Sequence, residues 1–485
     1  MQVQPKESVR ARSLDDLNHY TPVHVVWEIT LACNLKCSHC GSRAGKRRSE
    51  ELNTQEAFDV IDQLAVLGTR EITLIGGEAF IRKDWLDLIE RIAGHGIRVG
   101  MQTGARNLNQ TRLEAAKRAG LFGIGVSIDG MRAYHDKVRG VIGSWNQALQ
   151  AMEAAKQLGL GVSCNTQIGA ETIPQLEPLF NRIIEAGASH WQLQITVAMG
   201  NAVENDHLLL QPYQMLELMP LLNRLYLEGL QRGLLITFGN NLGYFGPYEH
   251  VWRGLGNERL HWSGCAAGQN VIGLEADGTI KGCPSLATAT YGGGNVRDKS
   301  IAELWNTSPE LHFGRLRNID ALWGHCRSCY YADVCRGGCT WTSDSLFGKP
   351  GNNPYCHYRA LRLEKRGLRE RIHKVAEAPD QPFATGRFEL IEEPIPGGHV
   401  LPEENLAMPR IARRDESEPL PQLALCRNCN EYIWPDEQKC PHCYADIAEA
   451  HYTYVQQEKK RRAMVDELKD VLSRLKTLTA FDSQV

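Results

Sequence analysis

Short apolar runs alternate with amphipathic segments of helical length over residues 24–196. The runs are rich in β-branched and aromatic residues, and in the segments between them apolar residues recur at helical spacing. Thr54 is expected to cap the first helix and Gly68 to end it. The runs predict six strands, at residues 24–30, 71–77, 98–104, 123–129, 161–169 and 190–196. Their alternation with helices predicts an α/β fold with a parallel sheet wound right-handed into a partial (β/α)6 TIM-like barrel.

Polar residues occupy one face of two of these strands. Side chains alternate between the two faces of a strand, so the polar set and the apolar set of each strand separate. The polar sets are Ser163, Asn165 and Gln167 in one strand and Gln192, Gln194 and Thr196 in the next. We expect a barrel lumen lined with amides and hydroxyls, which suits a polar substrate. Cys164 falls on the opposite, apolar face and is expected to be a buried structural cysteine.

The size and charge of the chain set broad limits. Its 485 residues exceed the usual size of a domain with a single core, so we expect more than one domain. Its net charge of −3 gives no reason to expect a nucleic-acid or membrane partner. Residues 1–20 lack an apolar signal-peptide core, and no run approaches the ~20 apolar residues of a membrane span. We therefore expect a cytoplasmic, reducing location, where the 15 cysteines are metal ligands before they are disulfides.

Composition shifts along the chain predict five parts. Proline and acidic residues mark a linker, and the last part combines four cysteines with a charged helical tail. The parts are the barrel at 20–200, a helical and loop-rich bridge at 201–260, a cysteine-rich domain at 261–375, the linker at 376–421 and the terminal module at 422–485.

Three cysteines follow the first predicted strand, at Cys33, Cys37 and Cys40. In parallel α/β sheets the reactive centre lies at the carboxyl ends of the strands, which places this loop at the mouth of the barrel. Three thiolates can hold a [4Fe–4S] cluster and leave one iron open for another ligand. A zinc site would need a fourth protein ligand, such as His39, so iron–sulfur is favoured.

This spacing resembles the signature of the radical S-adenosylmethionine (SAM) superfamily. The resemblance implies that Cys33, Cys37 and Cys40 hold the cluster and that its open iron binds the amino and carboxylate groups of SAM. Reductive cleavage would then give a 5′-deoxyadenosyl radical that abstracts a hydrogen atom.

Further motifs of that superfamily recur at successive predicted strand ends. By resemblance, Gly76, Gly77 and Glu78 bind the SAM amino group, and the segment at 126–130 contacts the ribose through Ser127, with Asp129 also among the cofactor contacts. Arg139 pairs with the SAM carboxylate, and Gln102 lies near the ligand. Relatives often read Thr-Asn-Gly at the third strand, whereas this chain has Thr103-Gly104, one residue shorter. A turn remains the alternative for the Gly-Gly-Glu stretch, and a loop hydrogen bond or solvated charge for Gln102, Asp129 and Arg139.

Seven cysteines lie between residues 265 and 356. That is too many for one zinc and close to the eight that two four-ligand clusters use, although a double zinc module is the alternative. The array resembles the SPASM domain of peptide-modifying radical SAM enzymes. The resemblance implies one auxiliary cluster on Cys265, Cys283 and Cys339, and a second on Cys326, Cys329, Cys335 and Cys356. Without a fourth cysteine, the first auxiliary cluster would keep an open iron unless another residue fills it.

The last four cysteines, Cys426, Cys429, Cys440 and Cys443, form two knuckles outside that resemblance. Their spacing is typical of a zinc ribbon or a rubredoxin-like site. Four thiolates leave no open position, so we expect a structural zinc or iron. His442 is expected at the surface and not as a ligand.

The favoured function is a radical SAM/SPASM oxidoreductase that matures a ribosomally synthesised precursor peptide by crosslink, thioether or backbone excision. The resemblance implies SAM, three [4Fe–4S] clusters and an electron donor such as flavodoxin or ferredoxin, with zinc or iron in the ribbon. One alternative is the same chemistry on a tetrapyrrole or on a folded protein such as a sulfatase, and the amide-rich strands lean towards peptide. Another is a metal-stabilised binding protein.

Recognition of the leader peptide is expected to need another element. Only residues 1–23 precede the first predicted strand, which leaves no room for the leader-binding module that many peptide maturases carry. We expect a separate leader-recognition protein, or the terminal ribbon and tail, to take that role.

Overall fold

The computed structural model describes residues 9–254, 257–315, 318–402 and 422–481, with side chains to residue 470. The chain divides into two compact units. The first, called the barrel unit below, contains residues 1–244 and 263–400, and the second, called the ribbon unit, contains residues 245–262 and 401–485. Part of the expected linker, residues 403–421, lies outside the described residues.

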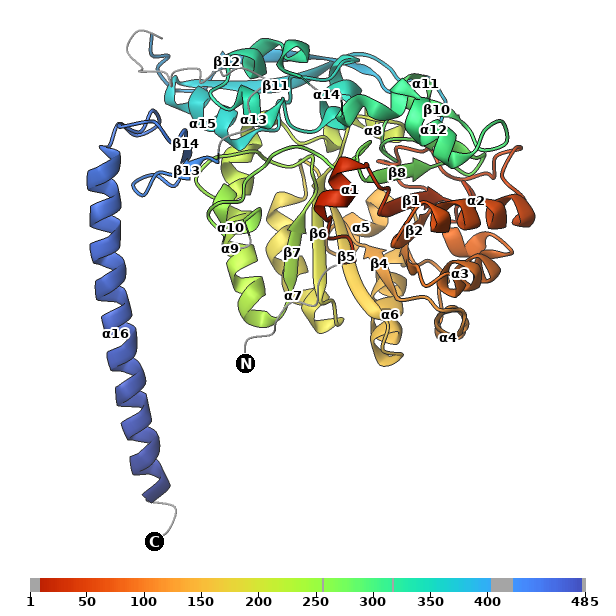
Figure 1. Cartoon of the computed structure of the whole chain (residues 1–485), viewed down its shortest axis with the longest axis horizontal. Helices are drawn as coiled ribbons and strands as arrows, with labels where there is room; N and C mark the ends of the chain where they lie inside the picture. The colour runs from red at the N-terminus through yellow and green to blue at the C-terminus, as the bar shows by residue number, and fades with distance from the viewer. Residues whose placement is uncertain (1–8, 255–256, 316–317, 403–421, 482–485) are drawn as a thin grey trace. The chain divides into compact units, whose positions relative to one another are not determined.

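The barrel unit is built on one ten-stranded sheet (Figure 1). Its strands run in the order β10-β9-β8-β1-β2-β3-β4-β5-β6-β7. Neighbours from β1 to β7 pair parallel, β8 pairs parallel with β1, and β9 and β10 are antiparallel. The strands are β1 His24–Glu28, β2 Glu71–Ile75, β3 Arg98–Thr103, β4 Gly123–Ser127, β5 Gly161–Ile168, β6 His190–Ile195, β7 Leu235–Phe238, β8 Val271–Leu274, β9 Thr279–Lys281 and β10 Gly292–Asn295.

The predicted α/β fold is confirmed, and all six predicted strands are present. The sheet is larger than the expected (β/α)6 barrel, because β7 extends one edge and the cysteine-rich region adds β8, β9 and β10 to the other. These four strands are only three or four residues long, too short to show a period in the sequence.

Helices cover the outer face of the parallel strands (Figure 1). They are α2 Thr54–Val66, α3 Trp85–Gly94, α4 Gln110–Ala119, α5 Arg132–Arg139, α6 Ser144–Gln157, α7 Leu176–Glu185 and α9 Met215–Arg232. The cap of α2 is Asn53, whose side chain accepts from Glu56 N, and not Thr54 as expected. Gly68 does follow the helix, with a φ of +82° that favours glycine.

Strand alternation separates the core from the lumen. In β1, Val25 and Trp27 are almost fully buried beneath the helices, while His24 and Val26 line a central cavity. The remaining elements of the barrel unit are α1 Leu14–Asn18, α8 Asn201–Glu204, α11 Thr288–Tyr291, α12 Ile301–Thr307, α13 Ala332–Cys335, α14 Thr340–Phe347, α15 His357–Lys365, β11 Leu368–Ala376 and β12 Arg387–Pro394. Strands β11 and β12 pair antiparallel, so part of the expected linker is an ordered strand.

The ribbon unit contains α10 Glu249–Trp252, the short strands β13 Ala424–Leu425 and β14 Tyr432–Ile433, and the long helix α16 Ile447–Phe481. Strands β13 and β14 pair antiparallel beside the four cysteines. In the described part of the chain, no helix combines the length and the apolar character needed to cross a bilayer.

Candidate active site

The loop that carries Cys33, Cys37 and Cys40 leaves the carboxyl end of β1 and is held by main-chain hydrogen bonds. Cys33 N donates to Gly45 O at 3.1 Å, and Ser38 N donates to Val138 O at 2.8 Å near the end of α5. These bonds fix the loop on both sides. The three thiols face a common space and form no disulfide.

The two glycines after β2 allow the cysteine loop to approach. Gly77 N donates to Thr30 O at 2.9 Å, and Glu78 N donates to Ala32 O at 2.8 Å. A Cβ on Gly76 would overlap Thr30 O, and a Cβ on Gly77 would overlap Ala32 O. The glycines are therefore required because two backbones meet here.

The three thiols open on a cavity of about 210 Å³ at the carboxyl ends of the strands. Six of the predicted residues line it together, from the ends of β2, β3 and β4 and from the end of α5, namely Gly76, Gly77, Glu78, Gln102, Ser127 and Arg139. A carboxylate, an arginine and polar side chains beside three thiols match the amino, carboxylate and ribose groups of SAM. The residues present therefore fit a cluster with SAM.

Glu78 is the buried anion of this cavity, with 1% of its surface exposed. Its carboxylate accepts hydrogen bonds from the Thr103 hydroxyl and, at 2.6 Å, from Gly104 N. Burial raises the pKa of Glu78 to about 7, although these two donors and Arg139 act in the opposite direction. Thr103 and Gly104, which sequence comparison marks only as a shortened motif, thus position the carboxylate.

Substitution Glu78→Gln is expected to weaken SAM binding about tenfold or more, because it removes the charge opposite the SAM ammonium. In the native protein, affinity for SAM should rise as the pH rises through about 7, since only the ionised carboxylate attracts the ammonium. The variant should show no such rise. Equilibrium dialysis of the reconstituted protein between pH 6 and pH 8 checks this, and an equal pH dependence in both proteins would contradict it.

Asp129 lies behind the cavity and anchors two of its side chains. It is fully buried, and its Oδ2 lies 2.7 Å from Arg139 Nε and 2.8 Å from His39 Nε2. Arg139 in turn donates from Nη1 to Cys37 Sγ at 3.6 Å. Asp129 was expected among the cofactor contacts, but it is not among the described residues that line the cavity. Its side chain orients Arg139, and His39 is occupied by Asp129.

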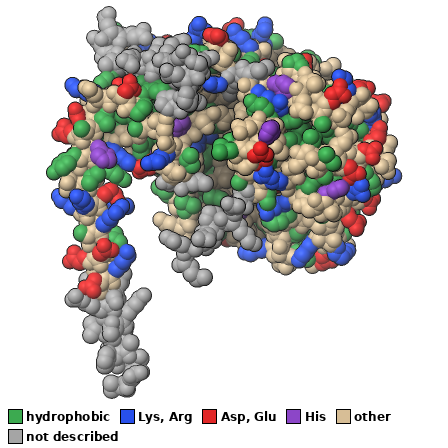
Figure 2. All heavy atoms as spheres, viewed as in Figure 1, with side chains coloured by type: hydrophobic (Ala, Val, Ile, Leu, Met, Phe, Trp, Pro, Cys, Tyr) green, Lys and Arg blue, Asp and Glu red, His purple; other side chains and the backbone are tan. Residues whose placement is uncertain are grey.

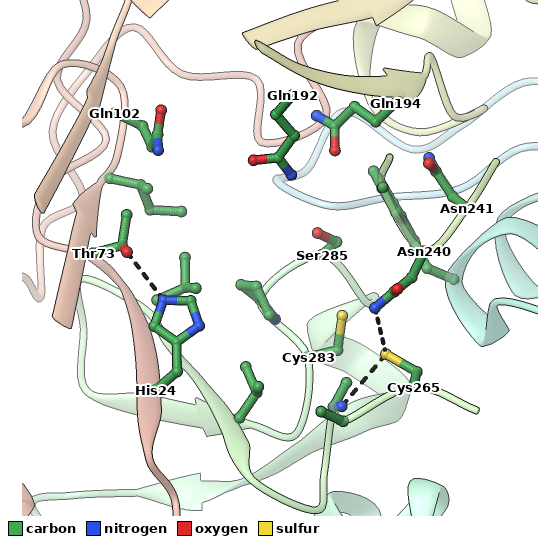
Figure 3. Close-up of a pocket in the computed structure, with 18 of the residues that line it drawn as sticks. His24, Thr73, Gln102, Gln192, Gln194, Asn240, Asn241, Cys265, Cys283 and Ser285 are labelled. Atoms are coloured by element: carbon green, nitrogen blue, oxygen red, sulfur yellow. Dashed lines mark hydrogen bonds between the residues drawn. The ribbon is translucent and has the colours of Figure 1, made fainter. Parts of the chain in front are cut away.

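A larger cavity of about 580 Å³ fills the lumen and adjoins the first (Figure 3). Ile75, Gln102, Ser127, Arg139 and Gln167 line both cavities. The lumen wall is rich in carboxamides, as predicted, from Gln102, Asn165, Gln167, Gln192, Gln194, Asn240 and Asn241. Two residues of the predicted polar faces lie off this wall, because Ser163 bonds to Ile124 O and Thr196 is buried. Cys164 is fully buried.

Cys265, Cys283 and Cys339 line the same lumen. Figure 3 shows Cys265 and Cys283 across the cavity from His24 and Thr73, with Asn240 donating to Cys265 Sγ at 3.2 Å. Burial, together with the neighbouring thiols of Cys265 and Cys339, raises the pKa of Cys283 to about 12. Such thiols ionise at neutral pH only when a cation binds them, which fits an iron–sulfur cluster.

The remaining thiols of the cysteine-rich region form a second group. Burial raises the pKa of Cys329 and of Cys356, and both are also raised by the charges of Cys326 and Cys335. None of the four forms a disulfide among the described residues. The seven thiols therefore lie in two neighbourhoods, three of them on the lumen and four around Cys329 and Cys356.

In the ribbon unit, the ligand atoms of Cys426, Cys429, Cys440 and Cys443 all lie within 4.8 Å of one another. That spacing suits one tetrahedral ion. His442 was expected at the surface, but it is buried, and its Nε2 contacts Tyr432 O at 3.1 Å. The ring is held by β14, so it supports the site without joining the four sulfurs.

Two family models match the chain. Residues 27–177 match the radical SAM superfamily, and residues 265–330 match the SPASM iron–sulfur cluster-binding domain. The ribbon cysteines lie beyond both matches. The two matched ranges contain the three thiols of the first loop and part of the second cysteine array.

Several curated proteins are similar over most of the chain. Mycofactocin maturase of Mycolicibacterium smegmatis is 30% identical over 363 residues, which cover 72% of this chain and 86% of that protein. AdoMet-dependent heme synthase of Oleidesulfovibrio alaskensis is 28% identical over 352 residues, 69% of this chain and 87% of that protein. Pre-heme d1 synthase of Dinoroseobacter shibae is 28% identical over 373 residues, 72% of this chain and 91% of that protein.

Solved structures share the fold at lower identity. Native anSMEcpe with bound AdoMet superimposes with a TM-score of 0.56 and 17% identity, over 70% of this chain and 95% of that one. Streptococcus suis SuiB bound to its precursor peptide SuiA gives a TM-score of 0.54 and 16% identity, over 70% of this chain and 77% of that one. These likenesses support the fold of the barrel unit.

Proposed function

Because the chain belongs to the radical SAM superfamily and carries a SPASM domain, we propose that this enzyme is a maturase of a ribosomally synthesised precursor peptide. The observation that carries the peptide assignment is the carboxamide wall of the lumen, between the SAM-side cavity and Cys265, Cys283 and Cys339. A carboxamide offers both a donor and an acceptor, as a peptide bond does. A relative named as a mycofactocin maturase and a fold neighbour crystallised with a precursor peptide support the same substrate class.

Two side-chain oxygen atoms on this wall are unsatisfied hydrogen-bond acceptors among the described residues. Asn165 Oδ1 and Asn241 Oδ1 are buried and have no hydrogen-bond partner among the described residues. The amide nitrogens of both residues are engaged, by Gln102 Oε1 and by Ile195 O at 3.0 Å respectively. An unsatisfied buried acceptor costs about 1–3 kcal/mol, so main-chain N–H groups of a bound peptide would be stabilised here.

In the proposed mechanism, Cys33, Cys37 and Cys40 would hold a [4Fe–4S] cluster, which together with SAM would supply the 5′-deoxyadenosyl radical for hydrogen abstraction. Glu78 holds the SAM ammonium, with Thr103 and Gly104 keeping the carboxylate in place. Arg139, fixed by Asp129, binds the SAM carboxylate. Ser127 would contact the ribose and Gln102 would lie near the ligand, while the lumen wall positions the peptide and excludes water. These contacts keep the radical away from solvent and from the wrong substrate atom.

The other proposed metal groups follow from the thiol sets. An auxiliary [4Fe–4S] cluster on Cys265, Cys283 and Cys339 would face the substrate, and a second would lie on Cys326, Cys329, Cys335 and Cys356. The ribbon would hold one zinc or iron. We further propose a cytoplasmic location, an electron donor such as flavodoxin or ferredoxin, and a separate leader-recognition protein.

A tetrapyrrole substrate is the second candidate. Arg10 and Arg12 line the lumen and would suit propionate groups, and two relatives are named as synthases of heme compounds. Two features favour peptide. Arg10 already donates to Glu71, and Trp341 is the one aromatic side chain among the described lining residues, whereas a macrocycle needs broad apolar faces.

The two substrates can be distinguished by substrate-dependent formation of 5′-deoxyadenosine. Reconstituted protein with SAM and a reductant is offered either synthetic short peptides encoded beside its gene or Fe-coproporphyrin III. We expect a peptide to raise 5′-deoxyadenosine formation above background. The mass of the peptide product should decrease by the hydrogen atoms removed. Gln192→Leu should lower that activity about 5- to 30-fold, since it removes one or two hydrogen bonds to the peptide, whereas Arg12→Gln should not. Turnover of Fe-coproporphyrin III that depends on Arg12 would overturn the peptide assignment.

A further inference from the structure

The ribbon unit joins the four-cysteine ribbon to a distant segment of chain. Residues 245–262, the insertion segment, leave the barrel unit after β7 and return just before Cys265. Arg427 pairs with Glu258 through two bonds, including Nη1 to Oε1 at 2.6 Å. Tyr432 Oη donates to Glu258 O at 3.0 Å and to Leu260 O at 2.8 Å. The insertion segment is therefore built against the ribbon.

Both ends of the insertion segment are fastened inside this unit. Phe245 N and Trp262 N donate to the two carboxylate oxygens of Glu249, at 3.1 and 2.7 Å. Glu249 is fully buried. Gly246 N donates to Glu431 Oε2 at 3.1 Å, so the ribbon itself also holds the first end.

The ribbon residues that make these contacts lie beside the four thiols. Glu431 and Tyr432 lie between the two knuckles, and Cys426 N donates to Glu431 O at 2.9 Å. One buried apolar cluster beside them consists of Cys426, Ile433 and Cys440, with Cys429, Cys443 and Ile447 packed against it. Because four of the six residues in this cluster are the proposed metal ligands, its packing depends on the bound ion.

The chain continues from the insertion segment directly into both auxiliary thiol groups. Tyr244 precedes Phe245, is buried, and accepts from Cys339 N at its hydroxyl at 2.8 Å. Its carbonyl oxygen lies 3.5 Å from Cys356 Sγ and accepts from Tyr358 N at 3.3 Å, two residues beyond that cysteine. At the other end, Cys265 follows Trp262 by three residues. A displacement of either end would therefore reach a cysteine of the auxiliary clusters through the covalent chain.

We propose that the ion bound by Cys426, Cys429, Cys440 and Cys443 clamps the insertion segment and thereby holds Tyr244 and Cys265 in place for the auxiliary clusters. The ribbon is then an assembly element of the iron–sulfur domain, and its metal content governs how much auxiliary iron the protein retains. This inference rests on the proposed function only for the presence of those clusters.

The test measures iron, sulfide and zinc in the full-length reconstituted protein and in three variants. Cys440→Ser should lose the ribbon ion and about eight irons, those of the two auxiliary clusters, while the paramagnetic resonance signal of the SAM cluster persists. Tyr432→Phe keeps all four thiols but not the two bonds to the insertion segment, and should lose auxiliary iron to a chelator about fivefold faster. Deletion of residues 459–485 removes most of α16 and should match the native protein.

Native iron content and chelation rate in both point variants would overturn the clamp. Loss of the SAM-cluster signal in Cys440→Ser would mean general unfolding. In that case the rate at which the chelator removes iron from Tyr432→Phe decides whether the clamp exists. The test measures the iron bound to the protein and does not depend on enzymatic turnover. A protein that retains its clusters but does not modify peptides would contradict the proposed function and leave the clamp standing.

Discussion

Cys37→Ala is expected to abolish reductive cleavage of SAM and to remove about four of the bound irons. Cys37 is one of three thiols on the cavity that fits SAM, and Arg139 donates to its sulfur at 3.6 Å. Two thiolates do not hold a four-iron cluster firmly, and the cluster supplies the electron that breaks the SAM bond. Enzymes commonly accelerate reactions by about 10⁶-fold or more, so 5′-deoxyadenosine formation should fall at least about 1,000-fold.

Cys164→Ala is the matched control for that experiment. Cys164 is also a cysteine of the barrel unit, but it is fully buried and is not among the described residues lining either cavity. Its replacement should cost about 1 kcal/mol of stability and leave iron content and SAM cleavage unchanged. The assay is chromatography of 5′-deoxyadenosine with iron analysis on the same samples. If Cys37→Ala cleaved SAM at the native rate, the loop that carries Cys33, Cys37 and Cys40 would have no part in the mechanism.

Asp129→Asn is expected to destabilise the fold by about 3–5 kcal/mol, because it leaves the buried Arg139 without its carboxylate. Burial alone would raise the pKa of Asp129, but Arg139 and His39 outweigh it and hold that pKa well below the usual range. A carboxyl group with a lowered pKa contributes its full stabilisation above its unfolded pKa and loses it only as the pH falls through the folded value. The difference between native and variant should thus be the same at pH 6 and pH 8.

The surface offers a matched control in Asp62, which pairs with Arg91 and His95 as Asp129 pairs with Arg139 and His39. These side chains are exposed to solvent, so Asp62→Asn should change stability little. Urea unfolding midpoints of the metal-free proteins measure both effects. Equal midpoints for the two variants would show that the buried pair does not hold the site.

The pattern of apolar and polar side chains was sufficient to predict the strands and helices that are long and regular. The strands at His24–Glu28 and Gly161–Ile168 follow from apolar runs between helices, and the alternation in β5 and β6 placed Asn165 and Gln192 on the lumen wall. Strand β10, Gly292–Asn295, offers three glycines and no pattern at all. Strand β12 lies in an acidic, proline-containing stretch and is held by pairing with β11, where Arg369 and Arg371 contact Glu393. No local signal reports such a pairing.

The candidate site shows the same limit. Spacing and resemblance brought the thiols, Glu78 and Arg139 to one cavity, but they could not show that Asp129 points behind it, because that depends on where Arg139 and His39 lie in space. The ribbon contacts the insertion segment through the Arg427–Glu258 pair, whose residues are 169 positions apart in the sequence. Such a contact is invisible to periodicity, which reads only neighbouring residues.

The most direct test of the central claim is the iron, sulfide and zinc content of the anaerobically reconstituted protein. Three [4Fe–4S] clusters and one structural ion predict about twelve irons, an equal amount of sulfide and one zinc per chain, or one further iron if iron fills the ribbon. Zinc alone, without sulfide, would show that the thiols of the first loop form a structural site, and it would contradict the assignment of a radical mechanism to this lumen.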